Sequence, residues 1–139
     1  MIRNILAVVI GLVVGMAFNM GLVVLNTALY PMPAGVSFEE PAGPEAYFKG
    51  LPLTAFLLVL VAHLGQSFFG ALVAATISRN AALRVAMIVG VLSLVGGVLN
   101  MLMMPLPTWM WLEFPLYLAV AYGAAWLVLV RRQSVSEAS

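Results

Sequence analysis

Residues 51–78 read LPLTAFLLVLVAHLGQSFFGALVAATIS and contain no Lys, Arg, Asp or Glu. A helix of about 20 residues, rising ~1.5 Å per residue, crosses a hydrocarbon core of about 30 Å. Three further apolar runs, at residues 5–30, 83–104 and 109–130, also reach this length. No run alternates polar and apolar residues as the strand of a membrane barrel does. The sequence therefore predicts an all-α, integral membrane four-helix bundle that forms one domain, residues 1–139.

The composition supports a membrane protein and excludes several functional classes. The chain is 64% hydrophobic and 8% charged, whereas a soluble domain has about 25% charged residues. It has no cysteine, which excludes the quinone-linked disulfide oxidoreductases that also use four membrane helices. It has no aspartate, which excludes the membrane proteases that depend on two facing aspartates. The few basic residues are dispersed, so we expect no nucleic-acid partner.

Charged residues predict the orientation of the bundle. Arginines flank the spans on one side and glutamates lie in the loop at residues 31–50 (Arg3, Arg79, Arg84, Arg131 and Arg132; Glu39, Glu40 and Glu45). Cytoplasmic loops of membrane proteins carry an excess of Lys and Arg. We therefore expect both termini and the link at 79–84 in the cytoplasm, with the loops at 31–50 and 104–110 outside.

The two ends of the chain carry different signals. Arg3 followed by an apolar run resembles a signal peptide. The run is longer than the apolar core of a signal peptide and no small-residue cleavage site closes it, so we favour a first transmembrane span at 5–30. The polar residues 133–139 predict a frayed tail.

The two halves of the chain echo each other. The spacing of Asn26, Pro31 and Pro33 recurs in Asn100, Pro105 and Pro107, and Pro52 and Pro115 each fall near the start of the next span. Because both hairpins would enter the membrane from the same side, this pattern raises the hypothesis of two parallel helical-hairpin repeats.

Small residues recur at helical spacing within the spans, and the main positions are Gly11, Gly15, Gly70, Gly90 and Gly97. Such residues let helix backbones approach closely in lipid, where no hydrophobic force drives helices together. We expect these glycines at helix contacts. The spacing alone leaves open whether the partner helix belongs to the same chain or to another copy.

Polar residues inside the spans fall into two predicted layers. Counted from the span ends at ~1.5 Å per residue, Asn19, His63, Gln66 and Ser67 lie near the middle of the membrane, and Asn26, Asn100 and Glu113 lie near its outer boundary. Small residues on the same faces bring the first two spans together. We therefore expect Asn19 to hydrogen-bond His63 or Ser67.

His63 is the only histidine in the chain, and an ionisable residue inside a membrane is a functional-site hypothesis. It could relay protons, bind a quinone or an anion, or ligate a haem. It could equally be half of an interhelical hydrogen bond worth about 0.6 to 2 kcal/mol. Ser67 and His63 are not expected to act as nucleophile and base, because both project from one helix and no carboxylate orients them.

Glu113 is the only acid in a predicted span. One interpretation is that it complements the positive end of the fourth helix. The alternative is an outer gate or ion-entry site that it forms with Asn26 and Asn100.

Three short clusters carry a resemblance to other proteins: Tyr30, Pro31, Met32, Pro33 and Gly35; Ala62, His63, Leu64 and Gly65; and Pro107 and Trp109 before Glu113. With them the chain resembles, over its whole length, an uncharacterised group of small four-helix bacterial integral membrane proteins. The resemblance implies a multi-pass location in the bacterial inner (cytoplasmic) membrane and no particular activity. Small multidrug-resistance transporters also have four short helices, but their first helix carries a glutamate and residues 5–30 contain none.

From these features we expect a non-catalytic module of the lipid bilayer, in a scaffold or accessory role, that packs with copies of itself or with a larger membrane complex. The alternative is a small proton-linked transporter or channel that uses His63, with Glu113 at its outer mouth. We expect no catalytic residues, no metal and no cofactor, because an enzyme here would need chemistry from outside the side chains.

Overall fold

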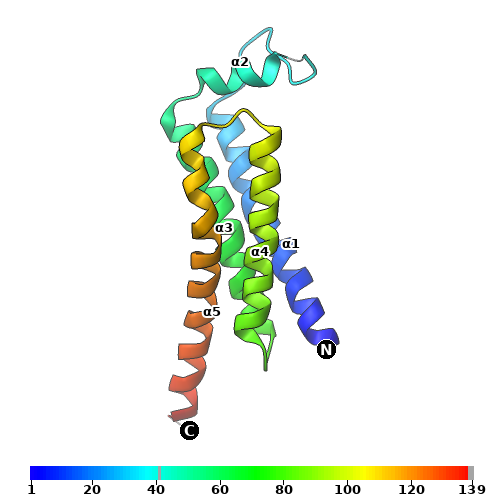
Figure 1. Ribbon diagram of the computed structural model, residues 1–139, viewed down its shortest axis with the longest axis vertical. Coiled ribbons are helices and arrows are strands. Elements are labelled where there is room, and N and C mark those ends of the chain that lie inside the picture. Colours follow the sequence, from blue (N-terminus) through cyan, green and yellow to red (C-terminus); the bar gives the residue numbers. More distant parts are fainter. Residues whose placement is uncertain (41, 138–139) are drawn as a thin grey trace.

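Four long helices form the bundle, and each runs opposite to the long helix before it (Figure 1). The computed structural model describes residues 1–40 and 42–137. In chain order the elements are α1 (Ile2–Leu29), α2 (Gly43–Gly50), α3 (Leu53–Ile77), α4 (Ala82–Met103), the 3-10 helix η1 (Thr108–Leu112) and α5 (Glu113–Glu137). The predicted all-α four-helix bundle is confirmed, and both termini lie at one end of it.

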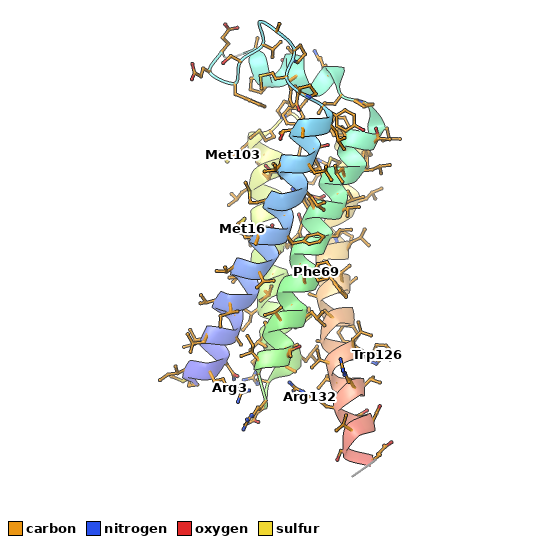
Figure 2. All side chains as sticks on the ribbon, turned by 180° about the vertical axis from the view of Figure 1, so that it is seen from behind. Arg3, Met16, Phe69, Met103, Trp126 and Arg132 are labelled. Carbon is orange, nitrogen blue, oxygen red and sulfur yellow. The ribbon has the colours of Figure 1, made fainter. Side chains whose placement is uncertain are left out.

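Each of the four long segments has the length and apolar character to cross a membrane: Ile2–Leu29, Leu53–Ile77, Ala82–Met103 and Thr108–Glu137. Side chains project outward along the whole bundle, and many of the exposed ones are large and apolar (Figure 2). Val13, Val24 and Leu102, for example, are 63%, 62% and 69% exposed. An apolar surface of this extent matches lipid rather than water, so the fold is that of a multi-pass membrane protein.

The last helix continues further than the sequence predicts. Residues 133–137 are helical instead of a frayed tail, and residues 138–139 of that tail lie outside the described residues. No Gly or Pro follows Gly123 to end the helix. The Ser134 hydroxyl also donates to the carbonyl oxygen of Val130 at 3.0 Å, within the helix. Polar composition alone was therefore not enough to end α5.

Helix α3 is the centre of the bundle, since it packs against α1, α4 and α5. Helix α3 runs parallel to α5, and residues fifty positions apart in the chain lie side by side. The Ser67 hydroxyl, for example, donates to the carbonyl oxygen of Tyr117 at 2.9 Å. Helix α1 lies along α3 and touches α4 only slightly. If a two-fold axis related the two halves, α1 would pack against α5 as closely as α4 packs against α3. Helix α4 does pack against α3, whereas α1 and α5 are barely in contact. The two halves share an order of elements but not their packing.

Small residues mark the closest approach of α1 to α3. A Cβ atom on Gly11 would lie 2.5 Å from the carbonyl oxygen of Gly70, and one on Gly15 would collide with the carbonyl oxygen of Gln66. Helix backbones can come this near only where side chains are absent.

Gly90 and Gly97 play the same part between α4 and α5. A Cβ atom on Gly90 would lie 2.7 Å from the Cβ of Ala121, and one on Gly97 would collide with the hydroxyl of Tyr117. The structure therefore places all five of the predicted packing glycines at contacts within this chain. Their partners are intramolecular, so these glycines provide no argument for an oligomer.

Small side chains fill the half of the bundle nearest the termini. The buried residues here come from α3, α4 and α5: Ala71, Ala74, Ala75, Ala82, Val85, Ala86, Val89, Ala121, Ala124 and Ala125. Helices that meet through alanine and valine leave little space between them. This half of the bundle, which we call the alanine core, is closely packed.

Two arginines close the terminal end of the bundle (Figure 2). Arg132 of α5 donates to the carbonyl oxygens of Ala75, Thr76, Ser78 and Arg79, at 3.0, 3.1, 2.8 and 3.4 Å. Arg3 of α1 donates to the carbonyl oxygen of Ile77 at 2.7 Å. The last carbonyls of a helix have no partner within it and form its negative end. These arginines therefore cap the C-terminal end of α3, in addition to lying at the arginine-rich end of the bundle.

Helix α2 lies across the opposite end of the bundle (Figure 1). The buried Tyr47 donates its hydroxyl to the carbonyl oxygen of Tyr30 at 2.8 Å, and the Tyr30 hydroxyl lies 2.8 Å from that of Thr54. On the exposed face, Lys49 hydrogen-bonds Glu45 at 2.7 Å and thereby holds the pKa of that carboxyl below its ordinary value. One face of α2 is thus fixed on the bundle and the other is charged.

Candidate functional site

A histidine and a glutamate form a buried pair inside the bundle. Nδ1 of His63 on α3 lies 3.2 Å from each carboxylate oxygen of Glu113 on α5. His63 is 8% exposed and Glu113 is 1% exposed. A buried carboxylate is very unfavourable unless it is paired and hydrogen-bonded. The ring N–H of His63 supplies that partner.

The pair shows that the expected separation into two polar layers is wrong. His63 lies ten residues after Leu53, the first residue of α3, whereas Glu113 is the first residue of α5. Helix α5 therefore begins about 15 Å deeper along the bundle than α3 does. The reason is η1, which forms a 3-10 turn from Thr108–Leu112, where the sequence predicts the start of the fourth span. Glu113 consequently meets His63 rather than lying in a separate outer layer.

Asn100 of α4 and Tyr117 of α5 complete the surroundings of the pair. Nδ2 of Asn100 lies 3.4 Å from Nε2 of His63, and the Tyr117 hydroxyl donates to Glu113 at 3.4 Å. As the Asn100 amide is oriented, Nε2 can accept a hydrogen bond while Nδ1 donates one, which is the bonding of a neutral imidazole. If the Asn100 amide rotated, its oxygen would accept from a protonated Nε2. The same residues can therefore hold both charge states of His63.

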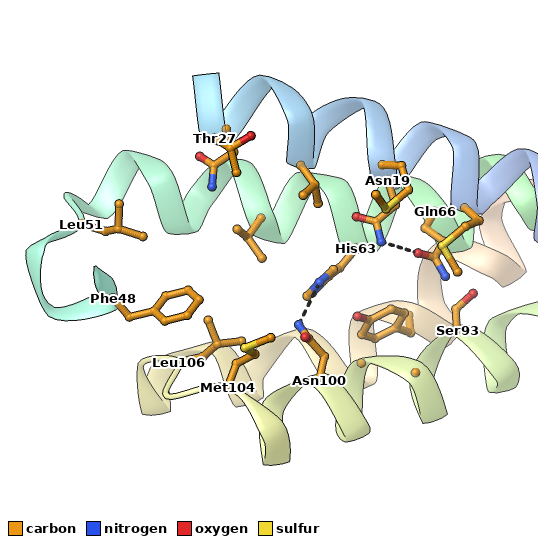
Figure 3. Close-up of a pocket in the computed structure, with 18 of the residues that line it drawn as sticks. Asn19, Thr27, Phe48, Leu51, His63, Gln66, Ser93, Asn100, Met104 and Leu106 are labelled. Atoms are coloured by element: carbon orange, nitrogen blue, oxygen red, sulfur yellow. Dashed lines mark hydrogen bonds between the residues drawn. The ribbon is translucent and has the colours of Figure 1, made fainter. Parts of the chain in front are cut away.

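Asn19 bonds Gln66, and the expected bond to His63 or Ser67 is wrong. Nδ2 of Asn19 donates to Oε1 of Gln66 at 2.7 Å (Figure 3). Ser67 instead faces α5, where it donates to Tyr117. With 3.6 residues per helical turn, neighbouring positions point about 100° apart. Gln66 therefore faces α1 and Ser67 does not.

A cavity of about 480 Å³ lies beside the pair, on the side of the bundle near α2 (Figure 3). Polar side chains from three of the long helices line it: Asn19, Asn26 and Thr27 of α1, His63 and Gln66 of α3, and Ser93 and Asn100 of α4. Tyr117 of α5 also lines it, and Phe48 of α2 lies at its covered end. Among the residues that the structure describes, no Lys, Arg, Asp or Glu lines this cavity.

Three of the residues that line the cavity each carry a buried polar atom with no hydrogen-bond partner among the described residues. They are Oδ1 of Asn19, Oδ1 of Asn26 and Oγ of Ser93. Asn26 is 7% exposed and Ser93 is 2% exposed. Each unpaired buried group costs about 1–3 kcal/mol. An occupant that forms hydrogen bonds, whether water or a larger molecule, would remove this cost.

Ser93 and Tyr117 are part of the site, although sequence reasoning missed both as polar site residues. Their signal is their spacing. Ser93 and Asn100 are seven residues apart on α4, as Asn19 and Asn26 are on α1, and residues seven apart share a helix face. Tyr117 follows Glu113 by four residues, which puts both side chains on one face of α5.

Two further results bear on the chemistry of the site. Within residues 1–40 and 42–137, no group of three or more His, Asp or Glu side chains is placed to hold a metal ion. Comparison with protein families, with curated proteins and with solved structures finds no match to this chain.

Proposed function

We propose that the protein is a non-catalytic membrane module that binds a small hydrogen-bonding molecule in the cavity beside His63 and Glu113. The observation that carries this proposal is that three residues lining one cavity, Asn19, Asn26 and Ser93, each carry an unpaired buried polar atom. More than nine in ten buried polar groups in proteins have a partner. Residues that only fastened helices together would be expected to pair with one another. Three unpaired atoms around one space favour a site with an occupant.

Access to the cavity follows from the orientation we propose. The positive-inside rule places the arginine-rich end in the cytoplasm, and the resemblance described above favours the bacterial inner membrane. The cavity then belongs to the outer half of the bilayer. The alanine core lies in the inner half, and none of its buried residues lines this cavity. A one-sided cavity supports binding more than conduction.

The bonding of the polar side chains supports a non-catalytic role. Covalent catalysis needs a nucleophile hydrogen-bonded to a base. The Ser67 hydroxyl donates instead to the carbonyl oxygen of Tyr117. Both ring nitrogens of His63 face other partners, Glu113 and Asn100.

A pair of glycine variants tests the binding function. Gly96 lines the cavity, and a Cβ atom there meets nothing within 4 Å; the same is true at Gly123, which does not line it. We expect Gly96→Val to fill part of the cavity and Gly123→Val to leave it free. Both variants should keep the fold, because neither added side chain meets a neighbouring atom at its Cβ.

The measurement is mass spectrometry of protein extracted from the membrane in polymer discs, without detergent. Wild type and Gly123→Val should retain one additional small molecule per chain, and Gly96→Val should lose it. Equal retention by all three proteins, or no retained molecule in any, would contradict the proposal. The same spectra count the chains in each particle, which tests the assembly with further copies or with a larger complex that we expect from the sequence.

A proton-linked transporter or channel is the second candidate, and the His63–Glu113 pair is the observation that favours it. The titratable groups in contact with His63 are Glu113 and Tyr117, both on α5, and Tyr47 of α2 lines the same cavity. The polar groups that α1 and α4 contribute to the lining are amides and hydroxyls. Asn100 can serve both charge states of the imidazole, as a proton carrier requires. Transport would additionally require the alanine core to open.

Proton flux into liposomes that contain the protein and a pH-sensitive dye tests this second candidate. A flux that His63→Gln and Glu113→Gln each abolish would support it, because neither glutamine can titrate. Flux no higher than in empty liposomes would reject transport by this chain alone. It would leave the binding proposal intact.

A further inference from the structure

We infer that the cavity takes the uncharged, hydroxyl-bearing head group of a membrane amphiphile, built on glycerol or a sugar. This inference rests on the proposed binding function and adds the chemical class of the ligand. The unpaired atoms, the charges around the cavity, and its size and surroundings each restrict that class.

The unpaired atoms favour a ligand that donates hydrogen bonds. Oδ1 of Asn19 and Oδ1 of Asn26 are amide oxygens, which accept hydrogen bonds and cannot donate them. Oγ of Ser93 can do both. Ketones, ethers and esters lack donors, so they would leave both amide oxygens unpaired. Hydroxyl groups donate and accept, and they match all three atoms.

The charges around the cavity exclude an ionised head group. Within the described residues, no Lys, Arg, Asp or Glu lines the cavity, and the nearest carboxylate, Glu113, is already bonded to His63. A phosphate, carboxylate or ammonium group would be buried here without a counter-charge, which is strongly unfavourable. The site therefore favours a head group with no net charge.

The size and surroundings of the cavity fit the head group of an amphiphile. Asn19 and Asn26 are seven residues apart, so their acceptors are about 10 Å apart along α1. That spacing and a volume of about 480 Å³ suit a head group with several hydroxyls. Met16 and Met20 line the cavity and are 51% and 49% exposed. Because α1 touches α4 only slightly, an acyl tail can leave between them into the lipid.

Three decyl probes test this inference on the full-length protein in phosphatidylcholine nanodiscs. The first is decyl β-glucoside, which has a sugar head group with donors. The second is its tetra-O-methyl derivative, which has the same ring and chain without donors. The third is decyl β-glucuronide, which adds a carboxylate. The readout is the melting temperature of wild type, Asn26→Leu, Gly96→Val and the control Gly123→Val.

Decyl glucoside near saturation should raise the melting temperature of wild type and of Gly123→Val by about 5 °C or more. The other two probes should produce a much smaller shift, and both Asn26→Leu and Gly96→Val should lose most of the glucoside shift. Equal shifts by glucoside and methylated glucoside, lost only in Gly96→Val, would overturn the ligand class and leave the binding function standing. A melting-temperature shift of wild type that is larger with the glucuronide than with the glucoside would also overturn the ligand class and leave the binding function standing.

Three further results are decisive. If no probe shifts wild type while a molecule of another class is retained in the polymer discs, the ligand class is wrong and the binding function stands. If no probe shifts wild type and no molecule is retained, water alone fills the cavity and both proposals fail. Equal shifts in wild type and both cavity variants would place the glucoside outside this cavity and overturn the inference.

Discussion

Nδ1 of His63 lies 3.2 Å from both carboxylate oxygens of Glu113, although the two residues are fifty positions apart in the chain. The contact joins α3 to the first residue of α5, and Asn100 brings α4 to the other side of the same ring. Three helices therefore meet at one polar point. The imidazole also lines the cavity, so the pair connects the stability of the bundle to the proposed site.

The first prediction concerns this pair. His63→Ala and Glu113→Ala should each lower the free energy of unfolding by about 3–5 kcal/mol, because each leaves its partner buried without a counterpart. The double variant should cost little more than either single variant, since the two changes remove the same interaction. Unfolding of the protein in mixed micelles measures all three. Additive losses would show that the two side chains are not coupled.

The sequence could predict the four membrane-spanning helices and the small residues at their contacts, because both depend on local features. Apolar length determines a span, and glycine spacing marks where backbones meet, as Gly11 and Gly15 do against α3. The depth of Glu113 could not be predicted by counting residues at the α-helical rise, because η1 advances about 2 Å per residue before α5 begins. Likewise, the residue of α3 that meets Asn19 depends on how α3 is rotated about its axis, because neighbouring positions point about 100° apart. The structure turns Gln66 rather than Ser67 toward Asn19.

The packing glycines lead to a second prediction. Gly15→Leu should destabilise the bundle by about 1–3 kcal/mol or more, because its side chain would meet the backbone of Gln66. Gly21→Leu on the same helix meets nothing at its Cβ and should be nearly neutral. On α4, Gly97→Leu and its neighbour Gly96→Leu should differ in the same way. Thermal unfolding of the four variants checks this, and equal losses within each pair would contradict it.

A third prediction concerns the cap of α3. Arg132→Gln should lower the free energy of unfolding by about 1.5–3 kcal/mol, the range for hydrogen bonds to a charged group, because four carbonyl oxygens lose their donor. Arg131→Gln removes the same charge one residue earlier and should have a much smaller effect. If both variants lost the same stability, net charge rather than capping would explain the role of Arg132.

The fourth prediction is the orientation of the bundle. The chain has no cysteine, so Glu39→Cys and Ser134→Cys each introduce a unique label site at an exposed position on opposite ends. In intact spheroplasts a membrane-impermeant maleimide should modify Glu39→Cys and spare Ser134→Cys, because the arginine-rich end is expected inside. The reverse pattern would invert the bundle, and modification of both sites would contradict a four-span topology.

The most direct test of the proposed cavity is the reactivity of a cysteine placed in it. Thiols react as thiolates, which need water or a polar environment. Gly96→Cys should therefore react with N-ethylmaleimide several-fold faster than Gly21→Cys on the exposed apolar surface of α1 or Ala86→Cys in the alanine core. Saturating decyl glucoside should slow Gly96→Cys alone. A rate at Gly96→Cys no higher than at the two control positions would show that no accessible polar cavity exists there, and the account would be contradicted.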